Sequence, residues 1–333
     1  MKKYFEEIYS KKTYNSTNNF ILNERNVLFF NIFIKNNKLY IITPINKNYN
    51  INKSTIKISY NSLEIICLEQ ITKAQYEPTQ IFIYDFNFNS EDIYEIKVSF
   101  NEKIKVFNLK HYKTYKNKKL ALTTLFKTDY KLNRIFYNYY KKQGVEHFYM
   151  YYNGKITDEI KKYYDKEDIT LIEWDYVYWN DNAKYSTHYA QLGQIHDAIY
   201  RFGKDKYEYM VFCDLDEYFY TKSVNLIDLI SDTSVDTFGF KNLWANTKDN
   251  NVPESFPNEF VVSNELLNYQ TRSKCIHKMD TVVYINIHYG EKFKSNKYSL
   301  KANYNMFHFH TWGGEYIDKF DTPKILKFIN ILL

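Results

Sequence analysis

From residue 120 onward, short apolar runs typical of strands alternate with segments that carry a helical pattern. Leu120–Phe126 and Val145–Tyr152 are two such runs. Between them, the apolar residues of Leu132–Tyr139 recur at helical spacing, which predicts a helix that ends at Gly144. Strands that alternate with helices form a mostly parallel sheet with right-handed crossovers and helices on both faces. The sequence therefore predicts a Rossmann-like α/β domain over residues 116–333.

The same alternation continues along the next part of the chain. The predicted elements are a helix over Asp158–Tyr164, a strand over Ile169–Trp174, a helix over Thr187–Phe202 and a strand over Tyr209–Cys213. The last of these is short and uncharged, as expected for a central strand that is covered on both faces.

Residues 1–115 follow a different pattern and are predicted to form a small, sandwich-like, all-β domain. The predicted strands are Val27–Ile34, Lys38–Thr43, Thr55–Tyr60, Leu63–Leu68, Ile81–Phe86, Ile93–Phe100 and Ile104–Leu109. Turns are predicted at Lys35-Asn36-Asn37 and at Asn61-Ser62. No group of acids, histidines or serines stands out here, which favours a structural or recognition role.

Three carboxylates follow the predicted strand that ends at Cys213. Asp214 and Asp216 have the spacing Asp-x-Asp (a DxD motif), and Glu217 comes directly after them. Ligands of open α/β sheets bind at the carboxyl ends of the strands, and paired acids suit a hard divalent cation that also holds phosphate oxygens. Asp216 is the first candidate for direct metal binding, whereas Asp214 contacts either the metal, the ribose or a metal-bound water. The alternative for a bare Asp-x-Asp is a solvated acidic turn.

Charge and cysteine content exclude several classes of protein. The 333-residue chain carries a net charge of +6, but its lysines are spread along the whole sequence. This argues against a nucleic-acid partner and agrees with an anionic small ligand or peripheral contact with an anionic membrane. The 3 cysteines form no Cys-x-x-Cys pair, so a reducing compartment is expected. We find no signal-peptide pattern and no apolar window near the roughly 18 residues that span a bilayer, which predicts a cytoplasmic location.

Several separated segments resemble glycosyltransferase family 92 and its bacterial relatives of GT-A type, in the right order along the chain. These segments are Leu120–Asp129, Gly144–Asn153, Gln191–Arg201, Asp214–Tyr218, Lys274–Ile276 with Val282, Val283 and His288, Asn305–Phe309, and Glu315–Lys319. Two segments depart from the family pattern. Asn246–Asn250 lacks a Phe-Gly pair, and Thr311–Gly314 replaces a Lys-Ser pair.

The resemblance implies a GT-A enzyme that uses a nucleotide-sugar and either Mn²⁺ or Mg²⁺. The donor-binding residues that it implies are Asp129, Asn153, Gln191, Asp197, Asp214 and Lys274. A late histidine often completes the metal site of such enzymes, which adds His308, and secondarily His288, to Asp214 and Asp216 as metal ligands. The alternative for each histidine is a core residue satisfied by hydrogen bonds.

The acceptor hydroxyl needs a general base, and the sequence offers several candidates. Asp249 and Glu254 lie in a loop rich in asparagine and proline after the acidic motif, and Glu259 follows them. Glu315, which comes after Gly313-Gly314, is a further candidate. The sequence does not choose among them.

Taken together, these features predict a metal-dependent glycosyltransferase of hexosyltransferase type. The donor is a nucleotide-diphosphate sugar, with a UDP-sugar expected first, the acceptor is a glycan or lipid-linked hydroxyl, and the anomeric carbon is inverted. One alternative is a metal-dependent phosphoesterase or nuclease, which would place more acids at neighbouring strand ends. Leu125-Phe126 and Tyr151-Tyr152 do not supply them, although Asp129 and Asp175 lie close by. The other is a non-enzymatic carbohydrate-binding protein built on the β-rich domain.

Overall fold

The computed structural model describes residues 14–15, 17–72, 79–88, 93–180, 189–247, 251–263, 272–313 and 328–332. Contacts divide the chain into two compact units. The first unit comprises residues 1–15, 118–173 and 207–333, and the second unit comprises residues 16–117 and 174–206. The fold is mixed α/β with strands predominating. The predicted division at residues 115/116 stays a prediction.

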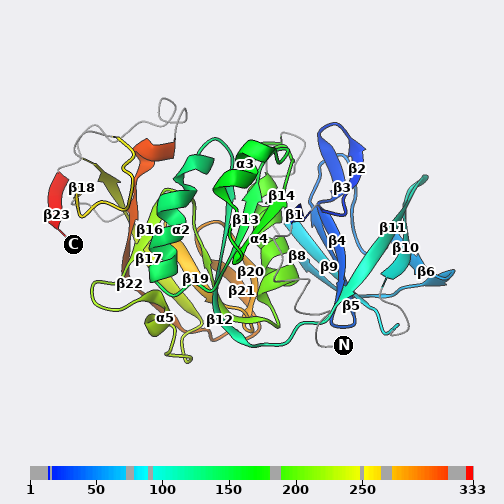
Figure 1. The fold of residues 1–333 in the computed structure, drawn as a ribbon. Helices are drawn as coiled ribbons and strands as arrows, with labels where there is room; N and C mark the ends of the chain where they lie inside the picture. The colour runs from blue at the N-terminus through cyan, green and yellow to red at the C-terminus, as the bar shows by residue number, and fades with distance from the viewer. Residues whose placement is uncertain are drawn as a thin grey trace. The chain divides into compact units, whose positions relative to one another are not determined.

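The first unit is built on a mixed sheet that has 11 strands within the described residues (Figure 1). Five neighbouring strands are parallel, in the order β1-β14-β13-β12-β15. Their bounds are β1 Tyr14–Asn15, β14 Ile169–Glu173, β13 His147–Tyr152, β12 Lys118–Phe126 and β15 Tyr207–Phe212. These strands confirm the predicted alternation of strand and helix in this part of the chain.

The other strands of this sheet make it mixed rather than mostly parallel as predicted. They are β16 Glu217–Tyr220, β17 Thr237–Asn246, β18 Glu259–Ser263, β19 Lys274–Lys278, β22 Leu300–His308 and β23 Phe328–Leu332. β19 runs antiparallel to both β15 and β17, and β22 pairs in parallel with β17 and antiparallel with β16. A separate hairpin joins β20 Val282–Ile285 to β21 Gly290–Phe293. Alternating apolar runs do not reveal strand direction, which explains the error.

Two helices pack on the parallel strands of the first unit (Figure 1). They are α2 Asn133–Lys142, preceded by the short 3₁₀ helix η1 Tyr130–Leu132, and α3 Asp158–Tyr163; the short α5 Leu226–Leu229 lies further along the chain. As predicted, α2 is followed by Gly144, which has φ +89°. A Cβ at Gly144 would stand 2.4 Å from Cβ of Ile227. Both the left-handed backbone and the close approach of α5 require glycine here.

The second unit contains an eight-stranded sheet in the order β7-β6-β10-β11-β4-β5-β9-β8, with the hairpin β2-β3 beside it. The bounds are β2 Phe20–Asn23, β3 Asn26–Phe29, β4 Asn31–Lys35, β5 Lys38–Pro44, β6 Ile56–Tyr60, β7 Leu63–Glu64, β8 Cys67–Thr72, β9 Thr79–Asp85, β10 Ile93–Phe100 and β11 Lys103–Tyr112. Both predicted turns are confirmed. Asn36 and Asn37, like Asn61 and Ser62, have the positive φ angles of a tight two-residue hairpin.

The predicted long helix is present but belongs to the second unit. It consists of α4 Tyr189–Asp197 followed by the π-helical η2 Ala198–Gly203, and all of its residues are buried. A Cβ at Gly193 would lie 2.6 Å from ring atoms of Phe30, so glycine allows the helix to approach that ring closely. Tyr200 packs against Tyr40 of β5. The helix thus covers the sheet of the second unit, which is therefore not an all-β structure.

No helix within the described residues is both long and apolar enough to cross a membrane.

Among the described residues, each unit contains a fully buried histidine that is expected to make stability sensitive to acid. His277 lies 3.0 Å from Thr237 Oγ1, and His196 Nδ1 lies 2.8 Å from the carbonyl oxygen of Leu192. Burial lowers the pKa of His277 to about 3 and that of His196 to about 4. In the unfolded chain a histidine has a pKa of about 6.5 and therefore binds more protons than in the folded chain. We expect the free energy of unfolding to fall as the pH decreases from 7 to 5.

Urea denaturation of the wild type and of His277→Gln at pH 7, 6 and 5 tests this expectation. The variant should lose part of the pH dependence, because glutamine does not titrate. An identical pH dependence in both proteins would contradict the assignment.

Candidate active site

The strand order of the first unit has a switch point between β12 and β15. In chain order the strands β14, β13, β12 and β15 run third, second, first and fourth, so that the chain first adds strands on one side of β12 and then forms β15 on its other side. Ligands of such sheets bind outside the carboxyl ends of the strands at this switch point. Asp129 follows β12, and Asp214 and Asp216 follow β15. The topology therefore brings the predicted acids to one edge of the sheet.

The acidic motif forms a tight turn between β15 and β16. The backbone N–H of Asp214 donates to Oε2 of Glu217 at 2.8 Å, and the N–H of Glu217 donates to the carbonyl oxygen of Asp214 at 3.1 Å. The Glu217 side chain is only 2 % exposed. Glu217 thus fixes the turn from inside, while the carboxylate of Asp214 stays 36 % exposed.

Lys274 supplies the positive charge beneath this turn. Its strand β19 lies beside β15, with Cys275 opposite Phe212. Its Nζ lies 2.6 Å from Oδ2 of Asp214 and 3.2 Å from Oε2 of Glu217, and its side chain is almost fully buried. Burial opposes the charge of Lys274, but the two carboxylates raise its pKa above the usual range. Lys274 is therefore a permanent cation that neutralises part of the acidic cluster.

His308 meets the acidic turn from the neighbouring strand. The register of β16 and β22 places His308 opposite Glu217, and Phe309 N–H donates to the carbonyl oxygen of Asp216 at 2.9 Å. His308 Nε2 lies 3.2 Å from Oδ2 of Asp216. Burial disfavours charge on both groups, but their mutual attraction raises the pKa of His308 and lowers that of Asp216. The two side chains form an ion pair when the imidazole of His308 is protonated.

Two further acids of the site, Glu217 and Asp129, have raised pKa values. Burial raises the pKa of Glu217 despite the opposing charge of Lys274. Asp129 accepts a hydrogen bond from the N–H of Lys127 at 3.0 Å. Burial, with the negative charges of Asp216 and Asp214 adding to it, raises the pKa of Asp129 to about 7. The negative charges that follow β15 therefore contribute to the raised pKa of Asp129, which follows β12, and a cluster of acids attracts a cation.

An aromatic and cationic group borders His308 and was missed by the sequence analysis. The ring centroids of Trp244 and His308 lie 4.6 Å apart at an interplanar angle of 31°, and those of Trp244 and His310 lie 4.9 Å apart in an edge-on arrangement. The guanidinium of Arg272 lies over Trp244, 5.2 Å from the ring centroid. Trp244 holds the imidazole of His308 in place because β17 pairs with β22 at this position. The sequence gives no sign of that long-range pairing.

The described residues offer two side chains that meet in a manner suited to a divalent cation, Asp216 and His308. Among these residues no group of three or more His, Cys, Asp or Glu side chains is arranged to hold a metal. The Asp214 carboxylate contacts Lys274, and His288 Nδ1 lies 3.1 Å from the carbonyl oxygen of Ser273. A cation held by Asp216 and His308 would take its other ligands from water or from phosphate oxygens, which suit Mn²⁺ or Mg²⁺.

The other predicted donor-binding residues lie in both units. In the first unit, Asn153 follows β13, is buried, and donates its backbone N–H to the carbonyl oxygen of Phe126 at 2.8 Å. In the second unit, Gln191 Oε1 accepts from the hydroxyl of Tyr178 at 2.8 Å.

Asp197, also in the second unit, is fully buried. Its Oδ1 accepts from Asn31 Nδ2 at 2.7 Å, and Arg201 Nη1 lies 3.8 Å from its Oδ2. The donor-binding roles of Asn153, Gln191 and Asp197 stay predictions.

Of the four candidate catalytic bases, Glu254 and Glu259 lie within the described residues. The side chain of Glu254 is 92 % exposed and forms an ion pair with Nη1 of Arg134 on α2 at 3.0 Å. Asp249 and Glu315 lie outside the described residues. The further candidate Glu259 begins β18.

Comparison with known families defines the class of this protein. Residues 134–323, more than half of the chain, match the sequence profile of glycosyltransferase family 92. The chain therefore belongs to glycosyltransferase family 92, which confirms the resemblance found in its motifs. It is a glycosyltransferase and as such takes a sugar donor and an acceptor. A search of curated proteins finds no match.

Proposed function

We propose that the protein is a metal-dependent GT-A glycosyltransferase that uses a nucleotide-diphosphate sugar. The observation that carries the proposal is the cluster at the switch point between β12 and β15. There Asp214 and Asp216 meet Lys274 and His308, and Asp129 is coupled to the same charges. Membership of glycosyltransferase family 92 supports a sugar-transfer reaction. It argues against the phosphoesterase, nuclease and non-enzymatic alternatives.

The chemistry of a nucleotide-diphosphate donor explains the need for such a cluster. A divalent cation, when bound, neutralises the negative charge that develops on the departing diphosphate. Asp216 and His308 would hold it. Lys274 fixes the Asp214 carboxylate, which leaves the other edge of Asp214 for the ribose or for a metal-bound water. Trp244 keeps the imidazole of His308 oriented toward Asp216.

Inversion at the anomeric carbon would require one direct displacement by the acceptor hydroxyl. A carboxylate base within hydrogen-bonding distance would remove the proton of that hydroxyl. Asp249, Glu254 and Glu315 remain the proposed candidates. We also propose a hexosyl donor linked to UDP, a glycan or lipid-linked acceptor, and a cytoplasmic location with peripheral membrane contact.

A thermal-shift and calorimetric screen of UDP-, GDP- and CMP-sugars tests the donor, each with Mn²⁺, with Mg²⁺ and with EDTA. We expect one nucleotide series to bind in the presence of the cation and to lose binding in EDTA. Without the cation, the two negative phosphates of the donor would be repelled by the acidic cluster. Unchanged binding and transfer in EDTA would overturn metal dependence while leaving glycosyl transfer intact.

The two histidines predicted as ligands can be separated by their effects on metal affinity. His308→Ala should weaken Mn²⁺ binding about tenfold or more, because it removes one of the two side chains that meet at the proposed site. His288→Ala is the matched control, since His288 contacts the backbone at Ser273. Titration calorimetry gives the affinities, and the melting temperature without metal identifies loss of folding. Equal affinities in the wild type and in His308→Ala would exclude His308 as a ligand.

A further inference from the structure

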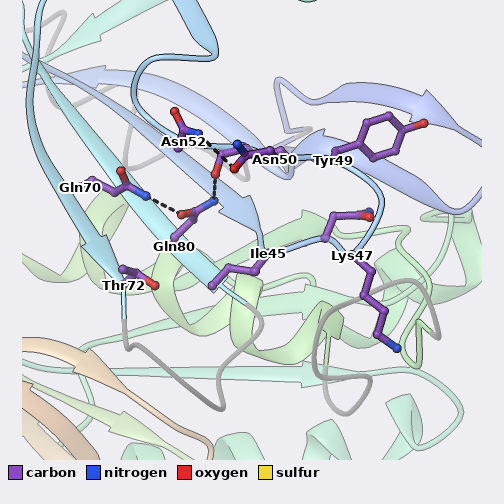
Figure 2. Close-up of a pocket in the computed structure, with 10 residues that line it drawn as sticks. Ile45, Lys47, Tyr49, Asn50, Asn52, Gln70, Thr72 and Gln80 are labelled. Carbon is purple, nitrogen blue, oxygen red and sulfur yellow. Dashed lines mark hydrogen bonds between the residues drawn. The ribbon is translucent and has the colours of Figure 1, made fainter.

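A polar cavity of about 570 Å³ lies in the second unit (Figure 2). It is formed by the segment 45–52, which follows β5, and by the neighbouring strands β8 and β9. Half of its ten lining residues carry side-chain amides: Asn46, Asn50, Asn52, Gln70 and Gln80. Its volume is within the range of about 300–1,000 Å³ that is common for small-ligand sites. None of its residues belongs to the candidate active site.

The amides are held in place by their own hydrogen bonds. Gln70 Nε2 donates to Gln80 Oε1 at 2.9 Å, and Gln80 Nε2 donates to the carbonyl oxygen of Ile51 at 2.9 Å. On the other wall, Asn52 Nδ2 donates to Asn50 Oδ1 at 3.1 Å. Gln80 is only 3 % exposed, so its side chain is held rigidly, and its hydrogen bond with Gln70 fixes the orientation of the Gln70 amide. Figure 2 shows both hydrogen-bonded pairs among the residues that line the cavity.

Several polar groups of the lining are left for a ligand. Among the described residues, no protein partner is present for Gln70 Oε1, Asn50 Nδ2 or the hydroxyl of Thr72. These three groups include an acceptor, a donor and a hydroxyl that can be either. Their side chains are half-buried or exposed, so a ligand can reach them.

The charges of the lining residues limit the class of ligand that the cavity can bind. Lys47 is the one charged side chain among the lining residues, and no carboxylate is present. In Figure 2 the Lys47 side chain extends away from Gln70 and Gln80. A nucleotide or another phosphorylated ligand would need more positively charged side chains in the lining. An apolar ligand would displace water from the amides without replacing the hydrogen bonds that the water makes. An uncharged molecule with many hydroxyl groups matches amides that both donate and accept.

We propose that this cavity binds an uncharged saccharide through Gln70, Asn50 and Thr72. Hydrogen bonds to a sugar replace hydrogen bonds to water, so the net gain per contact is small and binding is expected to be weak. The fixed geometry of the Gln70–Gln80 pair reduces the entropic cost of binding. The pocket gives the second unit a role in holding glycan that does not depend on the chemistry of transfer.

Saturation-transfer NMR on the full chain tests the proposal with neutral trisaccharides of glucose, galactose and N-acetylglucosamine. We expect signals from at least one of them, and a loss of about tenfold in affinity in the variant Gln70→Ala/Asn50→Ala. Asn108→Ala, which removes an exposed amide of β11 outside the cavity, should bind as the wild type does. Circular dichroism and the melting temperature confirm that each variant is folded.

Two results would overturn the proposal. One is the absence of a signal from every neutral trisaccharide, and the other is binding that the double variant leaves unchanged. The result is independent of the proposed transfer function, because Asp216→Asn should keep saccharide binding even where it loses metal-dependent donor binding. Preferential binding of sialyllactose that is lost in Lys47→Gln would assign the cavity to an anionic ligand instead.

Discussion

Asp216→Asn is expected to lower the rate of sugar transfer about 10³-fold. The substitution keeps the size of the side chain but removes its charge. In the structure that charge faces His308 at 3.2 Å, and the two groups are the ones that meet as proposed metal ligands. An asparagine oxygen is a weaker ligand for a hard cation, so Mn²⁺ affinity should fall together with turnover. Transfer assays and calorimetry measure the two effects on the same preparation.

Asp228→Asn is the matched control for this experiment. Asp228 is an exposed acid of α5 in the same unit, and its substitution should leave turnover and metal affinity unchanged. A fall in turnover without a change in Mn²⁺ affinity would show that Asp216 acts through His308 rather than as a metal ligand. Normal turnover in Asp216→Asn would exclude the acidic motif from the reaction.

The local part of the fold could be predicted from sequence because it rests on short-range patterns. The strand at Tyr209, the helix that ends before Gly144, and the turns at Asn36-Asn37 and Asn61-Ser62 all depend on apolar spacing or on backbone preference. The position of the acids at a strand end follows from the same reasoning. The sequence therefore predicts Asp214 and Asp216 as site residues without any long-range contact.

The rest of the fold and of the candidate site depends on pairing between strands that are distant in the sequence, which no local pattern predicts. The antiparallel entry of β19 brings Lys274 beneath Asp214, and the pairing of β17 with β22 brings Trp244 to His308. The helix α4 shows the same limit. Because all of its residues are buried, its periodicity does not reveal which sheet it packs on. The structure places it on the sheet of the second unit, although it follows the α/β pattern in sequence.

Lys274→Met should be the most destabilising substitution in the site. Methionine keeps most of the volume but leaves Asp214 and Glu217 without their shared cation. Removal of one partner from a buried ion pair typically costs about 3–5 kcal/mol, because the remaining charge is no longer compensated. We expect a loss of this size in the free energy of unfolding measured by urea. Lys278→Met, on the same strand, is the control, because Lys278 lies at the Tyr209 end of β15, where its Nζ donates to the backbone oxygen of Thr233.

The pH dependence of this loss identifies its cause. Burial already raises the pKa of Glu217 in the wild type, and removal of the opposing charge of Lys274 should raise it further. When the pKa of a carboxyl group is higher in the folded chain than in the unfolded chain, the protein becomes less stable as the pH rises through the folded pKa. Lys274→Met should therefore be more destabilised at pH 8 than at pH 5. The double variant Lys274→Met/Glu217→Gln should recover part of the stability that Lys274→Met loses at pH 8, because it no longer carries the uncompensated negative charge of Glu217. A loss that is equal at both pH values and is not reduced by Glu217→Gln would mean that Lys274 stabilises the fold by packing rather than by charge.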